Sequence, residues 1–495
     1  MGFTTIDYVI VLAYLIGVAA FGVLIGGKQK SAADYFVGGR KIPWLAVSFA
    51  VVATETSAIT FISIPGLAYL TNLNFLQIAI GYIIGRFAIA FLFLPSYYRG
   101  ELVTAYELLK TRFGDETRNY ASIVFLVTRT LATGVRLFTT AIPLAIIFKG
   151  YQIFSGYSST EVYALAIVVI TIFTFVYTYT GGIKAVIWTD VVQMFVYIGG
   201  AAIALYIMLS RLPDGWNTVL AMASAQSKFQ FIHWGFSGGI AHFFTDKYTF
   251  VASVLGGAFL SMASHGTDQL IVQRLLATDS LKSSQKAVIA SGFFVALQFL
   301  FFLVIGVVLY AFYKAAPFTD GDQIFPKFIV EQLPSGVSGI IVAGLFASAM
   351  GSLSGSINSL ASSTLVDLYR PYFGKNNSDE KDLRLSKLFS VVWTVILVAT
   401  AFIFIHSNES VIEIALSIAS VTYGGLLGTF LLGVLFKRPR QKDAIAGFTA
   451  GLLVLIVVFF FTNIAWTWYT LIGSLATIVV GLASSVIGAP SKLKV

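Results

Sequence analysis

Hydrophobic residues run along this chain in long, uninterrupted stretches separated by short polar loops. A window of about 19 residues finds apolar segments centred near Tyr14, Ala58, Gly85, Thr133, Thr171, Gly199, Phe259, Gln298, Met350, Leu397, Leu426, Ile456 and Val479. Each is long enough to cross hydrocarbon as a helix, which takes roughly 20 residues. Barrel strands are shorter and alternate in polarity, so the pattern predicts about thirteen transmembrane α-helices.

The composition excludes an ordinary soluble enzyme. Of the 495 residues, 57% are hydrophobic and 11% are charged, whereas a typical soluble domain has roughly 25% charged residues. We therefore predict an all-α integral membrane protein that forms one membrane domain over residues 1–495. The chain has no cysteine, which excludes disulfides and thiolate chemistry.

The basic residues are distributed unevenly between the two sides of the predicted membrane. Of the 32 Lys and Arg residues, 23 lie in one set of alternate loops, 6 in the other and 3 inside the spans. The positive-inside rule places the N-terminus outside and the C-terminus in the cytoplasm, in a cell (inner) membrane. Topology explains the net charge of +9, so we expect a lipid bilayer and a small-molecule substrate as partners, and no nucleic acid.

Ionisable residues inside the spans mark candidate chemistry, because each costs about 2.5–3.5 kcal/mol on insertion scales and usually faces a protein interior or a cavity. Glu55 lies in a polar stretch of the second span, residues 53–57. It is either paired for structure or contacts a substrate or ion beside unwound backbone. Arg129 and Arg136 are two helical turns apart and share a face. Each either pairs with Glu55 or a backbone carbonyl, or binds substrate.

Two further spans carry polar groups. Residues 261–269 form a second polar break with a single histidine, His265, and no second His or Cys stands at metal-ligand spacing. The span around Met350 carries hydroxyls on one helical face at Ser348, Ser352, Ser356 and Ser359. Small residues at this density either pack helices tightly or offer oxygens to a hard cation, for which sodium is suitable.

The spacing of the two broken spans predicts the architecture. They are five spans apart, as expected for inverted repeats with a binding site between discontinuous helices. We place the repeats at residues 46–210 and 248–436, after a leading helix at 7–26 and before trailing helices at 443–488. Phosphate-binding and hydrolase motifs are missing from the sequence. A membrane-embedded enzyme using Glu55, His265 and Asp268 would be favoured by a second carboxylate or His on the same face as Glu55. A channel would be favoured by a repeated filter sequence or charged rings. Neither feature appears in the sequence.

Several motifs in order resemble the sodium/solute symporter family, whose members carry glucose, sialic acid, proline, iodide or vitamins with sodium. The motifs cover residues 33–39, 53–65, 104–107, 181–190, 266–274 and 352–359. The resemblance implies a leucine-transporter-like 5+5 inverted repeat with one leading and two trailing helices. It also implies sodium as the coupled ion and no organic cofactor.

The resemblance implies a sodium site between the broken second span and the serine-rich span. Carried over by position, the ligands are the carbonyls of Ala53, Thr56 and Ser348 and the hydroxyl of Ser352. Gly351 stands where a further serine ligand is common.

A possible second ion site of the family would use Asp190 and Ser354. Its other serine positions hold Gly351 and Gly355, so we expect one coupling ion. Asp190 alternatively caps the N-terminus of its helix.

The resemblance also places the substrate. The matching positions are Glu55, Ser57, Thr60, Phe75, Ala79, Ala132, Ser261, Ser264 and His265. Members that carry sialic acid have an arginine near Ala132, and Arg136 lies one turn away as a relocated anchor. We favour a pair between Arg136 and Glu55 and a sugar or sugar-derived cargo. The alternative is an organic acid, such as sialic acid or a monocarboxylate, held by Arg136.

From these observations we predict a sodium-coupled secondary active symporter that imports a small polar solute by alternating access. We expect a monomer with no enzymatic activity.

Overall fold

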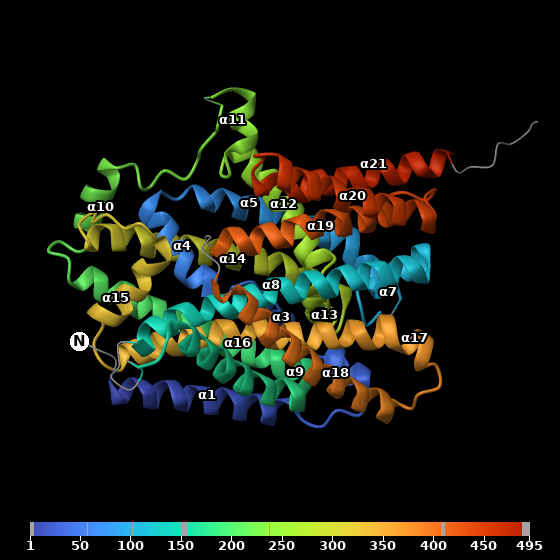
Figure 1. Cartoon of the computed structure of the whole chain (residues 1–495), viewed down its shortest axis with the longest axis horizontal. Coiled ribbons are helices and arrows are strands. Elements are labelled where there is room, and N and C mark those ends of the chain that lie inside the picture. The colour runs from blue at the N-terminus through green and yellow to red at the C-terminus, as the bar shows by residue number, and fades with distance from the viewer. Residues whose placement is uncertain are drawn as a thin grey trace, which may run out of the picture.

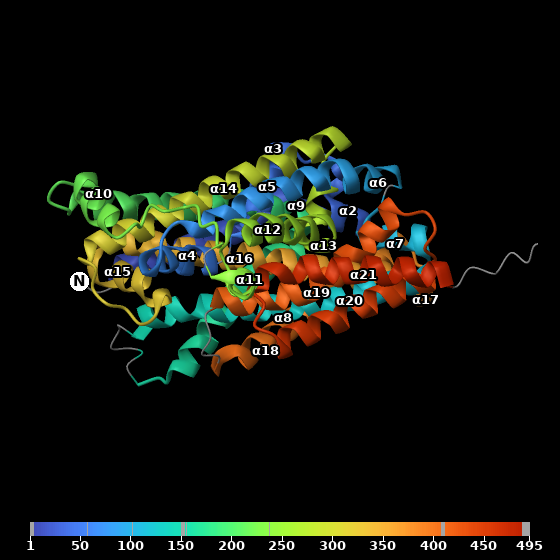
Figure 2. The same ribbon diagram turned by 90° about the horizontal axis from the view of Figure 1, so that it is seen from above.

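The protein is a bundle of helices. The computed structural model describes residues 4–56, 58–100, 102–149, 154, 156–236, 238–406 and 411–487, and it contains no β-strand within these ranges. Most of the long helices run side by side along one axis (Figures 1 and 2). Among the described residues, nine helical stretches are long and apolar enough to cross a membrane, or ten if one bent pair counts as a span. The predicted all-α membrane class is confirmed.

The long helices follow the predicted spans. They are α1 (Thr5–Gly26), α5 (Gln77–Ala88), α8 (Asp115–Lys149), α9 (Ser159–Ser210), α12 (Phe250–Gly266), α14 (Leu281–Phe312), α16 (Val337–Ser363), α18 (Asp379–Ile403), α19 (Val411–Leu435), α20 (Gln441–Phe461) and α21 (Tyr469–Ile487). Shorter helices are α2 (Ala32–Val37), α6 (Leu94–Arg99), α7 (Tyr106–Phe113), α10 (Trp216–Ala225), α11 (Gly239–Thr245), α15 (Ile324–Gln332) and α17 (Arg370–Phe373). The repeat limits at 46–210 and 248–436 stay predictions.

The first broken span consists of α3 (Trp44–Glu55) and α4 (Ala58–Leu70). The axes of Trp44–Glu55 and Thr60–Leu70 differ by 61°. Thr56 is extended, with ψ 110°, and its hydroxyl donates to the Val52 carbonyl at 2.7 Å. The Thr56 N–H donates to the same carbonyl at 2.9 Å, so the helical ladder of α3 ends with this bond.

The second broken span consists of α12 and α13 (Gln269–Leu275). Asp268 stands between them in extended conformation, and its Oδ1 accepts a hydrogen bond from the Leu270 N–H at 2.9 Å. An aspartate in this position caps a new helix. Both breaks therefore lie at the polar stretches from which the sequence predicts them.

Close backbone contact holds α5 against α12. A Cβ on Gly81 would lie 2.3 Å from the Val254 carbonyl oxygen, and one on Gly257 would lie 2.7 Å from the Ile78 carbonyl oxygen. Small residues at such crossings let membrane helices approach closely. This crossing brings the far end of α5 beside the ends of α3 and α12, where the candidate site lies.

A loop lysine fastens the end of α4 that lies away from the break. Lys228 donates to the carbonyls of Tyr69 at 2.6 Å and Thr71 at 2.8 Å, and it lies over the Tyr310 ring. A cation at a helix C-terminus is favourable. Burial lowers the pKa of Lys228 below its ordinary value.

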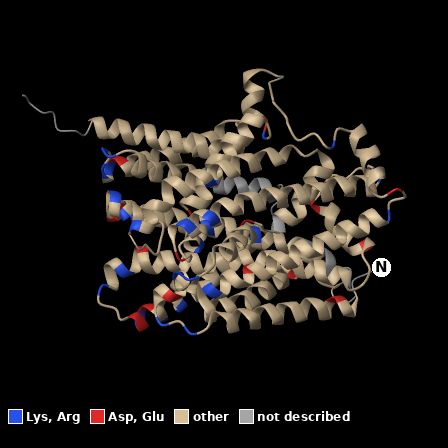
Figure 3. Ribbon diagram, turned by 180° about the vertical axis from the view of Figure 1, so that it is seen from behind, with Lys and Arg blue, Asp and Glu red and all other residues tan. Residues whose placement is uncertain are grey.

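Lys and Arg gather at the end of the bundle opposite the labelled N-terminus (Figure 3). This end carries α7 and α17 (Figure 1). The asymmetry agrees with the loop count made from the sequence, and the side of the membrane that each end faces stays a prediction.

Candidate functional site

Glu55, the last residue of α3, lies in a cluster of polar groups from four helices. It forms an ion pair with Arg86 of α5, and its Oε2 lies 3.3 Å from His265 Nε2 of α12. Arg86 also donates to Ser291 Oγ of α14 at 2.8 Å and contacts His265 Nε2 at 2.9 Å. Arg86 is fully buried, whereas Glu55 keeps 14% of its side chain exposed. The carboxylate is therefore neutralised within the protein.

Arg136 of α8 has no such partner. Its Nη1 donates to the Thr54 carbonyl at 3.3 Å, and no carboxylate in the described part of the chain lies within ion-pair distance of it. The favoured pair of Arg136 with Glu55 is therefore wrong, because Arg86 occupies the carboxylate. Arg136 also lines a narrow cavity of about 10 Å³ between α8 and α16, together with Ser352.

Arg129 lies two helical turns before Arg136 on the same face of α8, and its charge is paired within the protein. It forms a buried ion pair with Asp268 and donates to Tyr423 Oη of α19 at 2.8 Å, while Tyr423 also donates to Asp268. Because Asp268 caps α13 at the same time, this triad joins α8, α13 and α19. Arg129 is thus occupied, and its alternative role in substrate binding has no support.

The predicted sodium ligands lie on the two elements that meet beside the first break. Ser352 Oγ of α16 donates to the Thr54 carbonyl at 3.3 Å. Ala53 and Thr56 flank that carbonyl at the end of α3, and Ser348 is buried one turn before Ser352. The last carbonyls of a helix have no partner within it, and carbonyl and hydroxyl oxygens suit a hard cation. The donor set therefore fits sodium, and its role as a ligand set stays a prediction.

The remaining predicted substrate residues are spread around this centre. Ser264 Oγ lies 2.8 Å from His265 Nδ1 and so joins the Glu55 cluster. Ser261 donates to the Tyr82 carbonyl at 3.2 Å. The Phe75 ring packs against Phe299, with 5.2 Å between ring centroids.

Thr60 and Ser57 are the two remaining predicted substrate positions. Thr60 is buried on α4, and Ser57 lies outside the described residues.

Asp190 is not a helix cap, because it lies inside α9 and eight residues beyond the kink at Gly182. Its Oδ2 accepts from Arg274 Nη2 at 2.8 Å and from Thr54 Oγ1 at 3.3 Å. Both members of the Asp190–Arg274 pair are fully buried. A Cβ on Gly355 would lie 2.5 Å from Arg274 Nη2, so glycine there leaves room for the guanidinium.

Ser354, the other residue of the possible second ion site, donates to the Gly351 carbonyl at 3.1 Å. The carboxylate of that site already has a cationic partner, Arg274.

α13 is fastened to the surrounding helices by its polar side chains. Gln273 Nε2 donates to Asn358 Oδ1 of α16 and to the Phe36 carbonyl, both at 2.6 Å. Gln269 Nε2 donates to Ser362 Oγ at 3.2 Å, and Arg274 adds the link to α9. These contacts fasten α13 to α16, to α9 and to the backbone of α2.

Sequence reasoning missed Arg86, Tyr423 and Arg274 as parts of these networks. Arg86 carried a signal, because it is one of three arginines inside predicted spans. Its choice of partner depends on how the helices are rotated against one another. Tyr423 carries no comparable signal, since tyrosines are common here. Arg274 ends the motif at 266–274, but as a cation counted among the loops it gives no sign of a buried partner.

The chain is similar to known transporters along almost its whole length. The model of the sodium:solute symporter family matches residues 35–451. The sodium/sialic acid symporter of Proteus mirabilis is 30% identical over 99% of this chain and 97% of its own. That of Aliivibrio fischeri is 33% identical over 97% of this chain and 92% of its own.

Solved structures show the same likeness. A Na+-coupled sialic acid symporter in a substrate-bound outward-open state gives a TM-score of 0.86 at 27% identity, covering 99% of both chains. A nucleobase-cation-symport-1 family transporter gives 0.54 at 12% identity, covering 94% of this chain and 97% of its own, which concerns the fold alone. The predicted leucine-transporter-like fold is confirmed.

We expect the Asp190–Arg274 pair to be strongly coupled. Asp190→Asn and Arg274→Gln should each destabilise the protein by about 3–5 kcal/mol, because each leaves a buried charge without its partner. The double variant should recover part of that loss. Thermal unfolding of the four proteins in detergent measures the coupling.

The matched control is the exposed pair Glu380–Arg384, whose side chains are 73% and 78% exposed. The same cycle there should give only about 0.3–0.5 kcal/mol. Additive effects of Asp190→Asn and Arg274→Gln would contradict the coupling.

Proposed function

This chain belongs to the sodium:solute symporter family and is a sodium-coupled symporter, not an enzyme, and we propose that its cargo is a hydroxylated organic acid bound through Arg136. Sodium is its co-substrate, and it is a multi-pass membrane protein that carries a small molecule. The choice of an acidic cargo depends on how the charges at the site are paired.

The observation that carries the proposal is the unpaired charge of Arg136. Arg136 is partly buried, and its Nε is buried without a hydrogen-bond partner. A guanidinium inside a membrane-spanning bundle is costly without a counter-ion. Glu55 is already matched by Arg86 and His265, and Arg129 is matched by Asp268. A carboxylate on the substrate supplies the missing partner for Arg136, and a neutral sugar does not.

The exposed edge of Glu55 favours a hydroxylated acid over a simple one. With 14% of its side chain exposed, the carboxylate is still able to accept hydrogen bonds from substrate hydroxyls. An acidic sugar derivative offers both groups. The relatives named as sialic acid symporters support this class. The family resemblance implies an arginine near Ala132 in such members, so we assign the anchor to Arg136, one turn along α8.

Sodium and substrate would share one backbone group, the Thr54 carbonyl. Ser352, a proposed sodium ligand with Ala53, Thr56 and Ser348, donates to this carbonyl, and so does Arg136. An ion that fixes the end of α3 against α16 would therefore also set the position of Arg136. Each ligand would then raise the affinity of the other by the same factor.

We further infer the arrangement in the membrane. The N-terminus lies outside and the C-terminus in the cytoplasm of a cell (inner) membrane, because the basic residues gather at one end (Figure 3). The two inverted repeats span residues 46–210 and 248–436, and the protein works as a monomer. One sodium ion is coupled, since Gly351 and Gly355 remove hydroxyls from the second site and Arg274 occupies its carboxylate.

Arg136→Gln tests the anchor. Losing a buried charge-assisted pair costs about 2–5 kcal/mol, so sodium-driven uptake of radiolabelled sialic acid into proteoliposomes should fall at least about thirtyfold. Thermal unfolding should change little, because the substitution leaves no carboxylate of the protein unpaired. Arg86→Gln is the contrasting variant and should lower folding yield, since Glu55 then loses its partner. Full uptake by Arg136→Gln would contradict the anchor.

Ser352→Ala tests the sodium site. Loss of one hydroxyl ligand should raise the sodium concentration for half-maximal uptake about fivefold to tenfold, corresponding to roughly 1–1.4 kcal/mol. Ser359→Ala, on the same helix, removes a hydroxyl that donates to the Ser356 carbonyl and should leave this value unchanged. An unaltered sodium affinity in Ser352→Ala would place the ion elsewhere.

The sodium dependence of uptake should have a Hill coefficient near one, because the second ion site lacks oxygens and its carboxylate is paired. Initial uptake rates of the parent protein over a range of sodium concentrations measure it. A coefficient near two would overturn the single-ion assignment.

A further inference from the structure

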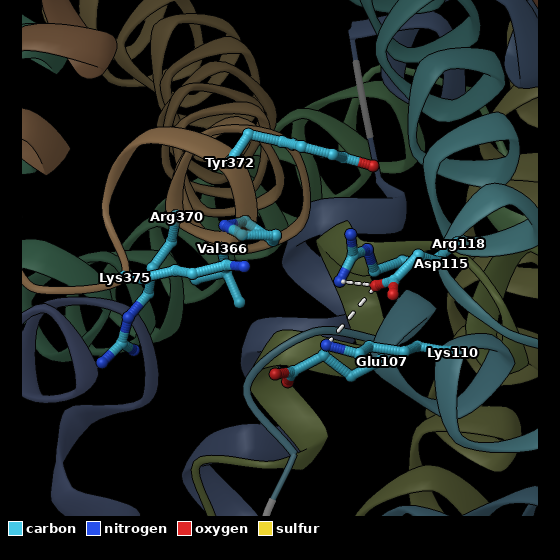
Figure 4. Close-up of a pocket in the computed structure, with 9 residues that line it drawn as sticks. Glu107, Lys110, Asp115, Arg118, Val366, Arg370, Tyr372 and Lys375 are labelled. Atoms are coloured by element: carbon cyan, nitrogen blue, oxygen red, sulfur yellow. Dashed lines mark ion pairs between the residues drawn. The ribbon is translucent and has the colours of Figure 1, made fainter.

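A pocket of about 500 Å³ opens at the basic end of the bundle, away from the transport site. Lys110 of α7 and Arg118 of α8 line one side, and Arg370 of α17 and Lys375, which follows α17, line the other (Figure 4). Its volume lies in the range of small-molecule sites. Transport in the proposed mechanism makes no use of it.

The two walls of the pocket are fixed to each other by hydrogen bonds. On the inner side, Thr104 just before α7 donates to Asp367 Oδ1 at 2.6 Å, and Ser363, on the same helical stretch as Asp367, donates to Asp367 Oδ2 at 2.8 Å and orients its carboxylate. On the outer side, Asn119 of α8 donates to Tyr372 Oη of α17 at 2.5 Å. The space between the walls is therefore built into the fold.

The charges of the pocket leave an excess of cations. Of its two carboxylates, Glu107 accepts hydrogen bonds from the backbone N–H groups of Val103 at 2.7 Å and Thr104 at 3.0 Å. Asp115 is shared between Arg118 at 2.9 Å and Lys110 at 3.4 Å.

On the opposite wall, Arg370 pairs with Asp382 at 3.4 Å. Lys375 forms no ion pair with any residue that the structure describes. An anion placed between the walls would meet Lys110, Arg118 and Lys375 together.

The pocket lies where apolar spans end. The span Val337–Phe373 finishes at its edge, and the span that starts at Asp115 begins there. Tyr372 is 56% exposed and Phe373 is 75% exposed. Aromatic residues at the end of a span are typical of the lipid headgroup level, and basic pockets at this level suit anionic headgroups.

We propose that this pocket binds a phosphate group, carried by an anionic phospholipid of the surrounding leaflet or by a soluble phosphate compound. Lys110 and Lys375 hold it from opposite walls, and buried Arg118 contributes its charge from α8. The bound group joins α7 and α8 to the end of the α16–α17 span. Binding does not depend on the identity of the transported solute.

The test uses the delipidated full-length protein in detergent. Dioctanoyl phosphatidylglycerol, dioctanoyl phosphatidylcholine and inorganic phosphate are titrated separately, and binding is followed by native mass spectrometry and thermal unfolding. The pocket variant is Lys110→Gln/Lys375→Gln. The matched control is Lys282→Gln/Lys286→Gln, which removes two exposed lysines from the first turns of α14.

Phosphatidylglycerol should bind the parent and stabilise it more than phosphatidylcholine does. Its affinity should fall about tenfold in the pocket variant, because each lysine near an anionic headgroup adds to binding, and should stay within about twofold in the control. Competition by inorganic phosphate would identify a soluble phosphate compound as a ligand, and its failure to compete would identify the lipid. No preference for the anionic lipid together with no binding of inorganic phosphate, or equal losses in both variants, would overturn the proposal.

Discussion

A charge buried among membrane helices must be matched by an opposite charge, and the rest of this structure depends on how that is done. Arg86 with Glu55, Arg129 with Asp268 and Arg274 with Asp190 each join two different helices. All three carboxylates lie at or beside the broken spans or their neighbour α9. The pairs thus hold unwound backbone in place inside the protein, because hydrocarbon offers no hydrogen-bond partners to its N–H and C=O groups.

The unmatched charge of Arg136 connects this framework to transport. Its nearest hydrogen-bond acceptor is the Thr54 carbonyl, which also accepts from Ser352, while the Thr54 hydroxyl reaches Asp190. One residue at the end of α3 is therefore in contact with the proposed substrate anchor, the proposed sodium site and the Asp190–Arg274 pair that fastens α13. Thr54 therefore provides a direct structural link among these three groups.

The sequence alone predicts the spans, both breaks and the family, because these follow from apolar length and from local polar motifs. It does not predict which arginine neutralises Glu55. That choice depends on helix rotation, set by contacts far apart in the sequence such as Gly81 against Val254. The charges alone allow a pair between Arg136 and Glu55, but in the structure Arg86 of α5 pairs with Glu55 of α3. The room that Gly355 gives to Arg274 is likewise visible only in three dimensions.

We propose that one sodium ion moves together with one substrate carboxylate, which Arg136 neutralises in the site. Such a cycle carries no net charge. The most direct test is uptake of sialic acid into proteoliposomes under a fixed sodium gradient, with the membrane potential set by potassium and valinomycin. We predict the same initial rate at zero potential and at an inside-negative potential. Acceleration by a negative potential, where one elementary charge gains about 2.3 kcal/mol per 100 mV, would contradict the account.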